Sequence, residues 1–248
     1  MTPIEATRAL LNQAATLRQG YLDVLGASVS SPAPTVAQRA MNSPLVATVY
    51  ERVWRPLAFY TASGVTTGSE QRRARRDLRP TGTAKLLDIA CGPGNFTRRL
   101  ADELSDDGLA VGLDISEPML TRAVADNSGP RTCYLRADAR ALPFEDETFD
   151  AVCCFGALYL MPEPLRVAQE MVRVLAPSGR IAILTSCQSG FAPARLVTTP
   201  AAAVVGLRMF DHDTFVDMFA SAGLIDIHQD IQRAMQYVTA TKPPNPAR

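Results

Sequence analysis

The sequence has no excess of charge of either sign, because 25 lysines and arginines balance 25 aspartates and glutamates. Proteins that bind nucleic acids over a broad surface normally carry a basic excess, so zero net charge argues against that class. The basic run Arg72–Arg76 contains no interleaved aromatic residue. It is typical of the solvated face of a helix rather than of a phosphate-binding patch. We therefore expect no nucleic-acid partner.

Long apolar runs and a leader segment are also missing. No apolar run approaches the roughly 18–20 residues that span a bilayer. The first residues, Met1–Glu5, lack the basic stretch and apolar stretch of a signal peptide. The five cysteines are odd in number and none form a C-x-x-C pair, which disfavours a structural zinc site. These features predict a cytoplasmic protein with reduced cysteines, no membrane span and no metal.

The chain is nevertheless long and apolar enough for a substantial core, with 248 residues of which 47% are hydrophobic. That length suits one large domain or one domain with an appendage. Apolar residues recur at helical spacing over residues 4–25, and a linker rich in Ser and Pro follows. We expect an N-terminal helical extension over residues 1–40 and a main domain over residues 41–248. The proline-rich end from residue 241 is predicted to be disordered.

From Lys85 the sequence alternates between short apolar runs and segments of helical period. This alternation predicts an α/β fold with a doubly wound parallel sheet. The runs are nearly continuous in Val, Ile, Leu and Cys, as in strands that are covered on both faces. The predicted strands cover residues 85–90, 109–114, 132–136, 149–155, 180–185, 224–231 and 234–240. A helix is expected at 211–222.

The most informative segment is a glycine loop between the first of these strands and the next helix. Residues 86–97 read LLDIACGPGNFT. Gly92 and Gly94 allow a tight turn and a close approach of the backbone to a ligand. The helix that follows offers unpaired N–H groups. The loop resembles the dinucleotide signature G-x-G-x-x-G only weakly, because Thr97 stands where the third glycine would be.

Three aspartates stand at or near the ends of successive predicted strands, at the sheet edge where open α/β folds bind ligands. Asp88 can receive an ammonium group, or it can be structural and accept loop N–H groups. Asp114 is placed to accept two ribose hydroxyls, and Asp138 to accept an adenine amino proton. Such a ring of carboxylates would repel a pyrophosphate. It suits a cofactor that has an amino acid end, a ribose and an adenine but no phosphate.

These motifs together resemble the class I S-adenosylmethionine-dependent methyltransferases, in particular the ubiquinone/menaquinone-methyltransferase-like branch. The resemblance covers residues 50–185 and includes residues 111–116, 137–139, 149–152 and 170–181, where Ser178 replaces a usual glycine. It implies a doubly wound, Rossmann-like, mostly parallel seven-stranded sheet that ends in an antiparallel C-terminal hairpin. It also implies S-adenosyl-L-methionine as cofactor and S-adenosyl-L-homocysteine as product.

The motifs and the resemblance together imply a set of cofactor-binding residues in the loops and at the strand ends. These residues are Tyr50, Asp88, Ala90, Cys91, Gly92, Gly94, Asp114, Ile115, Met119, Asp138, Ala139, Cys154 and Phe155. Tyr50 and Trp54 stand at helical spacing, so both are equally well explained as core residues.

The acceptor side of such a site is less defined by the sequence. Methyl transfer from a sulfonium needs chiefly alignment, and a general base only for some acceptors. Tyr159 and His212 are the candidates for acid/base or orienting roles. We expect O- or C-methylation of an apolar small molecule, with a lid formed by the N-terminal helices and residues 191–209. An NAD-type dehydrogenase and a non-catalytic S-adenosylmethionine-binding protein remain open alternatives for the function. A homodimer remains an open alternative for the oligomeric state.

Overall fold

The structure is a computed structural model and describes residues 1–26, 64, 66–105, 107–188 and 207–245. Its strands are β1 (Thr16–Arg18), β2 (Tyr21–Asp23), β3 (Lys85–Ile89), β4 (Leu109–Asp114), β5 (Thr132–Arg136), β6 (Phe149–Phe155), β7 (Leu175–Ser186), β8 (Ile225–Gln232) and β9 (Met235–Thr241). Its helices are α1 (Pro3–Leu10), α5 (Thr67–Leu78), α6 (Asn95–Ala101), α7 (Glu117–Asn127), the 3₁₀ helix η3 (Leu158–Leu160), α8 (Pro164–Val174) and α10 (Thr214–Ser221).

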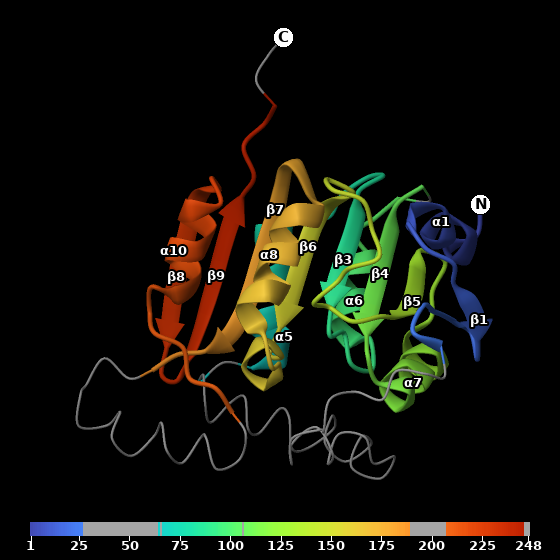
Figure 1. Cartoon of the computed structure of the whole chain (residues 1–248), viewed down its shortest axis with the longest axis horizontal. Coiled ribbons are helices and arrows are strands. Elements are labelled where there is room, and N and C mark those ends of the chain that lie inside the picture. Colours follow the sequence, from blue (N-terminus) through green and yellow to red (C-terminus); the bar gives the residue numbers. More distant parts are fainter. Residues whose placement is uncertain (27–63, 65, 106, 189–206, 246–248) are drawn as a thin grey trace.

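The described strands form one sheet in the order β1-β2-β5-β4-β3-β6-β7-β9-β8 (Figure 1). Strands β2 to β7 run parallel, while β1, β8 and β9 pair antiparallel with their neighbours. The strand order reverses at β3, which pairs with β4 on one side and with β6 on the other. Open α/β sheets bind ligands at this switch point, beyond the carboxyl ends of the strands. The predicted fold class is confirmed.

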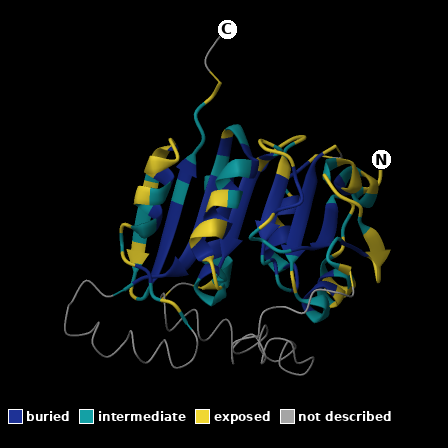
Figure 2. Cartoon of the chain, viewed as in Figure 1, coloured by how far each residue is buried: buried dark blue, intermediate teal, exposed yellow. Residues whose placement is uncertain are grey.

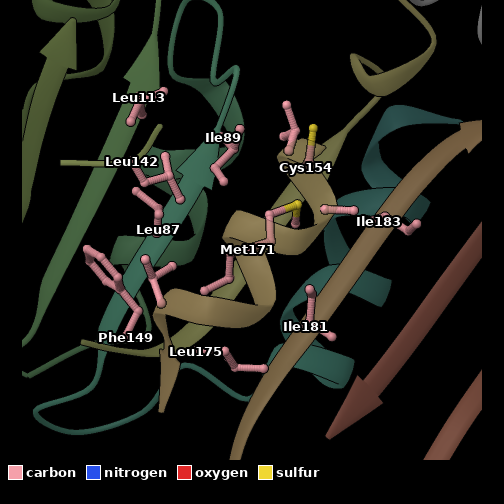
Figure 3. Packing of buried hydrophobic residues seen from close by; sticks show 14 of the residues in the cluster. Leu87, Ile89, Leu113, Leu142, Phe149, Cys154, Met171, Leu175, Ile181 and Ile183 are labelled. Atoms are coloured by element: carbon pink, nitrogen blue, oxygen red, sulfur yellow. The ribbon is translucent and has the colours of Figure 1, made fainter. Parts of the chain in front are cut away.

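Two helical layers cover the sheet, with α1, α8 and α10 on one face and α5, α6 and α7 on the other (Figure 1). Side chains alternate along each strand, so Leu87 and Ile89 enter the first layer while Leu86 enters the second. Figure 3 shows the first layer, where Met171 of α8 packs among strand residues. The parallel strands are buried on both faces, as their apolar sequences predict (Figure 2).

The N-terminal segment differs from the predicted helix over residues 4–25. Helix α1 begins with a capping box, in which Glu5 N donates to Thr2 Oγ1 and Thr2 N donates to Glu5 Oε2, and it ends at Leu10. Residues 16–23 form a hairpin whose turn is Gln19 and Gly20, both with positive φ. Such a two-residue turn matches the twist of paired strands. The seven predicted strands are therefore joined by two more, and the helical extension is wrong beyond Leu10.

The end of the chain is more ordered than its proline content predicts. Strand β9 continues to Thr241, and the backbone N–H of Lys242 donates to Gly179 O at 2.9 Å. Lys242 Nζ donates to Leu175 O at 2.8 Å and lies 3.1 Å from a carboxylate oxygen of Glu147. The predicted disorder is thus wrong at residues 241 and 242. Residues 246–248 and the predicted boundary at residue 40 lie outside the described part of the chain.

The turn inside β7 gives a stability prediction of opposite sign at two neighbouring positions. Ser178 is exposed and has φ +63°, whereas a Cβ on Gly179 would lie 2.6 Å from Ala176 O. We expect Ser178→Gly to stabilise the protein by about 0.5–1 kcal/mol, because relief of left-handed strain exceeds the entropy that glycine adds to the unfolded chain. Gly179→Ala should destabilise it by about 1–3 kcal/mol through overpacking. Urea unfolding measures both; a loss of stability in Ser178→Gly would contradict the strain argument.

Candidate functional site

The glycine loop lies between β3 and α6 at the switch point of the sheet. Ala90, Gly92 and Gly94 all have positive φ, at +54°, +55° and +80°. The loop is fastened to the end of β4 because Cys91 N donates to Leu113 O at 3.0 Å. Its conformation therefore depends on left-handed backbone at three alternate positions, and one of these is alanine, for which that conformation costs about 1–2 kcal/mol.

Tyr134 of β5 supports this loop from below. A Cβ on Gly94 would lie 2.3 Å from Tyr134 Oη, so only glycine fits there without displacing the ring. Tyr134 Oη donates to Asn127 O at 2.8 Å, and Asn127 Nδ2 donates to Pro93 O at 2.7 Å. Burial raises the pKa of the Tyr134 phenol. The neutral tyrosine and the asparagine thus link β5 and α7 to the loop.

Asp88 lies in β3 beneath the loop and is only 2% exposed. Its Oδ2 accepts a hydrogen bond of 2.6 Å from Thr97 Oγ1 in α6, and Cys153 Sγ lies 3.6 Å from its Oδ1. A Cβ on Gly112 of β4 would lie 2.9 Å from the same Thr97 hydroxyl. The structure thus brings Asp88 to the site in a role that anchors α6. The ammonium contact stays a prediction.

Asp114 ends β4 and connects two loops at the carboxyl edge. Its Oδ2 accepts from Gly92 N at 2.9 Å and its Oδ1 accepts from Ser116 N at 2.9 Å. Burial raises the pKa of the Asp114 carboxyl, although these N–H donors act to lower it. Ile115 beside it leaves 37% of its surface exposed, which is unusual for an isoleucine next to a core. Met119, one helical turn further on, is buried.

Asp138 follows β5 and is paired with its own neighbour, Arg140. The guanidinium donates to both carboxylate oxygens, with Nε 3.1 Å from each and Nη2 2.7 Å from Oδ2. Arg140 Nη1 also donates to Glu163 at 2.9 Å. Burial acts to raise the pKa of Asp138, but Arg140 lowers it on balance. An adenine amino group would therefore share this carboxylate with Arg140. Ala139 between them is half-buried.

The structure does not bring the side chains of Cys154 and Phe155 to the loop. Cys154 is fully buried in the α8 layer. Phe155 points into the other layer, with its ring centroid 5.0 Å from that of Phe96 and 6.1 Å from that of Tyr237. Consecutive strand residues point to opposite faces, so both side chains belong to the core. Their backbone at the end of β6 is what remains available to a ligand.

The two candidate acid/base residues lie further along the same edge. Tyr159 lies in η3 after β6, is partly buried, and accepts a hydrogen bond from Arg208 N at its carbonyl. His212 Nε2 lies 2.8 Å from Gln188 O. A carbonyl only accepts hydrogen bonds, so Nε2 carries a proton in this arrangement. Tyr50, Trp54 and most of the predicted lid at residues 191–209 lie outside the described residues.

Metal and membrane features can be stated for the described ranges only. There, no group of three or more His, Cys, Asp or Glu side chains is arranged to hold a metal ion. Within the same residues, every helix is too short or too polar to traverse a bilayer.

The site combines an open, doubly wound α/β sheet with a glycine loop and a carboxylate at its switch point, which defines a nucleoside-binding Rossmann-like class. Residues 86–179 match the family model for the methyltransferase domain. An Arabidopsis thaliana chloroplast protein, described as an uncharacterised methyltransferase, is 30% identical over 217 residues. The match covers 84% of this chain and 61% of that protein. The demethylmenaquinone methyltransferase of Shouchella clausii is 37% identical over 105 residues, which cover 41% of this chain and 45% of that enzyme.

Solved structures show the same fold at low sequence identity. Phosphoethanolamine N-methyltransferase 2 of Haemonchus contortus, in complex with S-adenosyl-L-methionine, has a TM-score of 0.66 at 16% identity, covering 83% of this chain and 58% of that chain. The [4+2]-cyclase SpnF has a TM-score of 0.63 at 19% identity, covering 87% of this chain and 98% of that one. Residues 86–179 thus form a class I S-adenosylmethionine-dependent methyltransferase domain, with distant homology to demethylmenaquinone methyltransferases.

The residues present fit the cofactor that this family uses. Gly92 and Gly94 carry no side chain that would block the approach of a ligand to the loop backbone, and a Cβ at Gly94 would meet Tyr134. Asp114 offers carboxylate lone pairs to hydroxyl donors, and exposed Ile115 offers an apolar surface to a base. No role was predicted for Thr97, Asn127 and Tyr134, because their partners lie in other helices, strands or loops and leave no local pattern.

Gly94 provides a test of the loop that separates backbone strain from the close approach. Gly94→Ala should cost roughly 2–4 kcal/mol of stability and weaken S-adenosylhomocysteine binding, because strain and a clash with Tyr134 add together. Gly223 has φ +78° but nothing within 4 Å of the position of a Cβ, so Gly223→Ala should cost only about 1 kcal/mol and leave binding unchanged. Denaturant unfolding and calorimetry measure the two effects. Equal losses in both variants would rule out the role of Tyr134.

Proposed function

We propose that this protein transfers a methyl group from S-adenosylmethionine to an oxygen or carbon atom of a hydrophobic small molecule. The observation that carries the proposal is the Asp114 carboxylate, hydrogen-bonded to Gly92 N at the switch point and next to the exposed Ile115. This arrangement offers a ribose two acceptor oxygens and offers a base an apolar surface. Family membership supports the same reading.

In this proposal the chain's own residues divide into a cofactor side and an acceptor side. When bound, the cofactor supplies an electrophilic methyl group on a sulfonium with a neutral thioether leaving group. Gly92, Gly94 and Asp114 hold the nucleoside and the amino acid end of the cofactor. Met119 lies in the wall of the site behind them. Since the leaving group is neutral, the chain needs chiefly to align the acceptor and exclude water, and alignment alone can supply a large share of the rate.

Two observations weigh on the alternatives. A nicotinamide dehydrogenase would share the glycine loop, but Asp88, Asp114 and Asp138 surround this edge with carboxylates that disfavour a pyrophosphate. A cyclase activity is a further candidate, because the fold of the [4+2]-cyclase SpnF matches 87% of this chain. Fold alone does not determine chemistry, so that candidate stays beside methyl transfer.

Two observations support an apolar acceptor. The relatives of this chain include demethylmenaquinone methyltransferases, and the chain spans about half the length of those enzymes. An apolar acceptor agrees with Tyr159, which follows β6 and is partly buried against both hydrophobic clusters. We also propose that the protein acts in the cytoplasm, since the five cysteines are free and buried as in a reducing compartment. A homodimer is retained as part of the proposal.

The function is tested by binding and by transfer with the same preparation. We expect the protein to bind S-adenosylhomocysteine but not NAD in calorimetry, and to move a tritiated methyl group into the organic extract of a lysate. Asp114→Asn should weaken S-adenosylhomocysteine binding about tenfold or more, because one charged acceptor is lost. Asp150→Asn is the control, since Asp150 also accepts a backbone N–H at 2.8 Å, from Lys85 at the opposite edge. Label found only in RNA or protein would refute the proposed acceptor class.

Variants of Tyr159 and His212 test whether a side chain takes part in proton transfer. If either acts as a base or orienting group, Tyr159→Phe or His212→Ala should lower kcat by at least about tenfold while cofactor affinity stays constant. If catalysis is positional, both variants should retain kcat within that factor. Initial rates on the identified acceptor, measured beside the S-adenosylhomocysteine dissociation constant, distinguish the two cases.

A further inference from the structure

A buried ion-pair cluster joins the N-terminal hairpin to the wall of the cofactor site. Asp23 ends β2 and Arg136 ends β5, and the two residues face each other across parallel strands. Asp23 is 3% exposed and Arg136 is 9% exposed. Burying two charges costs free energy unless their partners are well placed. A buried cluster of this kind is therefore better explained by a structural or functional role than by solubility.

One guanidinium in this cluster contacts two other segments of the chain. Arg136 Nη1 lies 3.3 Å from Asp23 Oδ2 and donates to Gly26 O at 3.0 Å, both in the N-terminal segment. Arg136 Nε donates to Ile115 O at 3.3 Å, and Nη1 lies 3.0 Å from Glu117 Oε1 at the start of α7. Arginine can make these contacts at once because its donors are arranged in a fixed planar fork.

Asp23 completes the link on the other side. Its Oδ1 accepts from Leu25 N at 2.9 Å and from Gly26 N at 3.1 Å, which folds the chain back at the end of the hairpin. Its Oδ2 also accepts from Arg18 Nη1 at 3.1 Å. The carboxylate therefore links both strands of the hairpin to the turn at Leu25 and Gly26 that follows it.

The segment that Arg136 holds is the one that carries the proposed ribose acceptor. Ile115 directly follows Asp114, and Ser116 N donates to Asp114 Oδ1 within the same turn. Glu117 is the first residue of α7. A shift of this turn would change both the direction of the Asp114 carboxylate and the position of the Ile115 side chain.

We propose that Arg136, held by Asp23, is a positioning residue for the cofactor and makes the Asp114–Glu117 turn depend on the N-terminal hairpin. The inference rests on the proposed function, since it assigns that turn to the nucleoside. The hairpin thereby acts as part of the cofactor site, although none of its residues needs to touch the ligand. A residue outside the ligand contact can change affinity when it belongs to a contiguous network of this kind.

The test uses conservative variants and a matched arginine elsewhere. Arg136→Lys keeps the charge but cannot span all its partners. Asp23→Asn keeps a carbonyl oxygen for Leu25 and Gly26 but removes the charge. The control is Arg173→Lys, because Arg173 also bonds two carboxylates and two backbone carbonyls, in segments that precede β6 and β7 and so lie at the opposite edge.

Calorimetry with S-adenosylhomocysteine and hydrogen exchange of the ligand-free full chain are the readouts. We expect Arg136→Lys to raise the dissociation constant about tenfold and Asp23→Asn about threefold. Both variants should also speed amide exchange at residues 115–117. Arg173→Lys should change the dissociation constant by less than about twofold, even if its stability in urea falls as much.

The outcomes separate this inference from the proposed function. If the unaltered protein binds S-adenosylhomocysteine and both variants bind it within about twofold of that value, Arg136 is not a positioning residue. If the unaltered protein does not bind S-adenosylhomocysteine, the proposed function fails. The exchange rates at residues 115–117 then still decide whether Arg136 holds the turn, and unchanged rates overturn that too. If Arg136→Lys does not fold, Asp23→Asn supplies both readouts.

Discussion

The hydrogen bond from Gly92 N to the Asp114 carboxylate joins the two loops on which the ligand edge depends. It requires a backbone N–H turned toward β4, which the positive φ of the glycine provides, and a carboxylate at the last position of that strand. The carboxylate loses hydration there, and the rise in its pKa reflects that cost. Two backbone donors offset part of the cost and also fix the direction of the remaining lone pairs. The same contact that closes the loop therefore shapes the edge for a hydroxyl-bearing ligand.

The central sheet was predictable because its strands are buried on both faces, and burial on both faces leaves a continuous apolar sequence. Residues 85–89, 109–114 and 132–136 illustrate this, since nearly every position is buried. The N-terminal hairpin was not predictable in the same way. Its apolar residues happen to fall at helical spacing, while the feature that sets the structure is the turn at Gln19 and Gly20. Local backbone conformation overrode the periodicity there.

The candidate site was predictable where a residue's role depends on its place in a strand, and not where it depends on a partner. Asp114 stands at the end of β4, and its contact with the glycine loop follows from the topology. Asp138 stands at an equivalent place, but Arg140 two residues later takes up its carboxylate. The opposite directions of Cys154 and Phe155 could have been foreseen, because neighbours in a strand covered on both faces cannot both face one ligand.

The contacts of the polar groups around the glycine loop and on the proposed acceptor side limit which residues can take part in proton transfer. Around the glycine loop the polar groups are hydrogen-bonded to partners within the fold, as Asp88 is to Thr97 and Tyr134 is to Asn127. His212 differs, because its Nε2 proton points to Gln188 O, which leaves Nδ1 as the ring nitrogen that carries the lone pair. Burial raises the pKa of the Cys91 and Cys154 thiols, which removes them as bases near neutral pH. Among the described residues, the neutral thiols thus leave Tyr159 and His212 as the candidates for proton transfer, with alignment alone as the alternative. Alignment alone suffices for an acceptor whose nucleophilic atom already belongs to an anion, such as an enolate or a phenolate, because no proton then has to be removed.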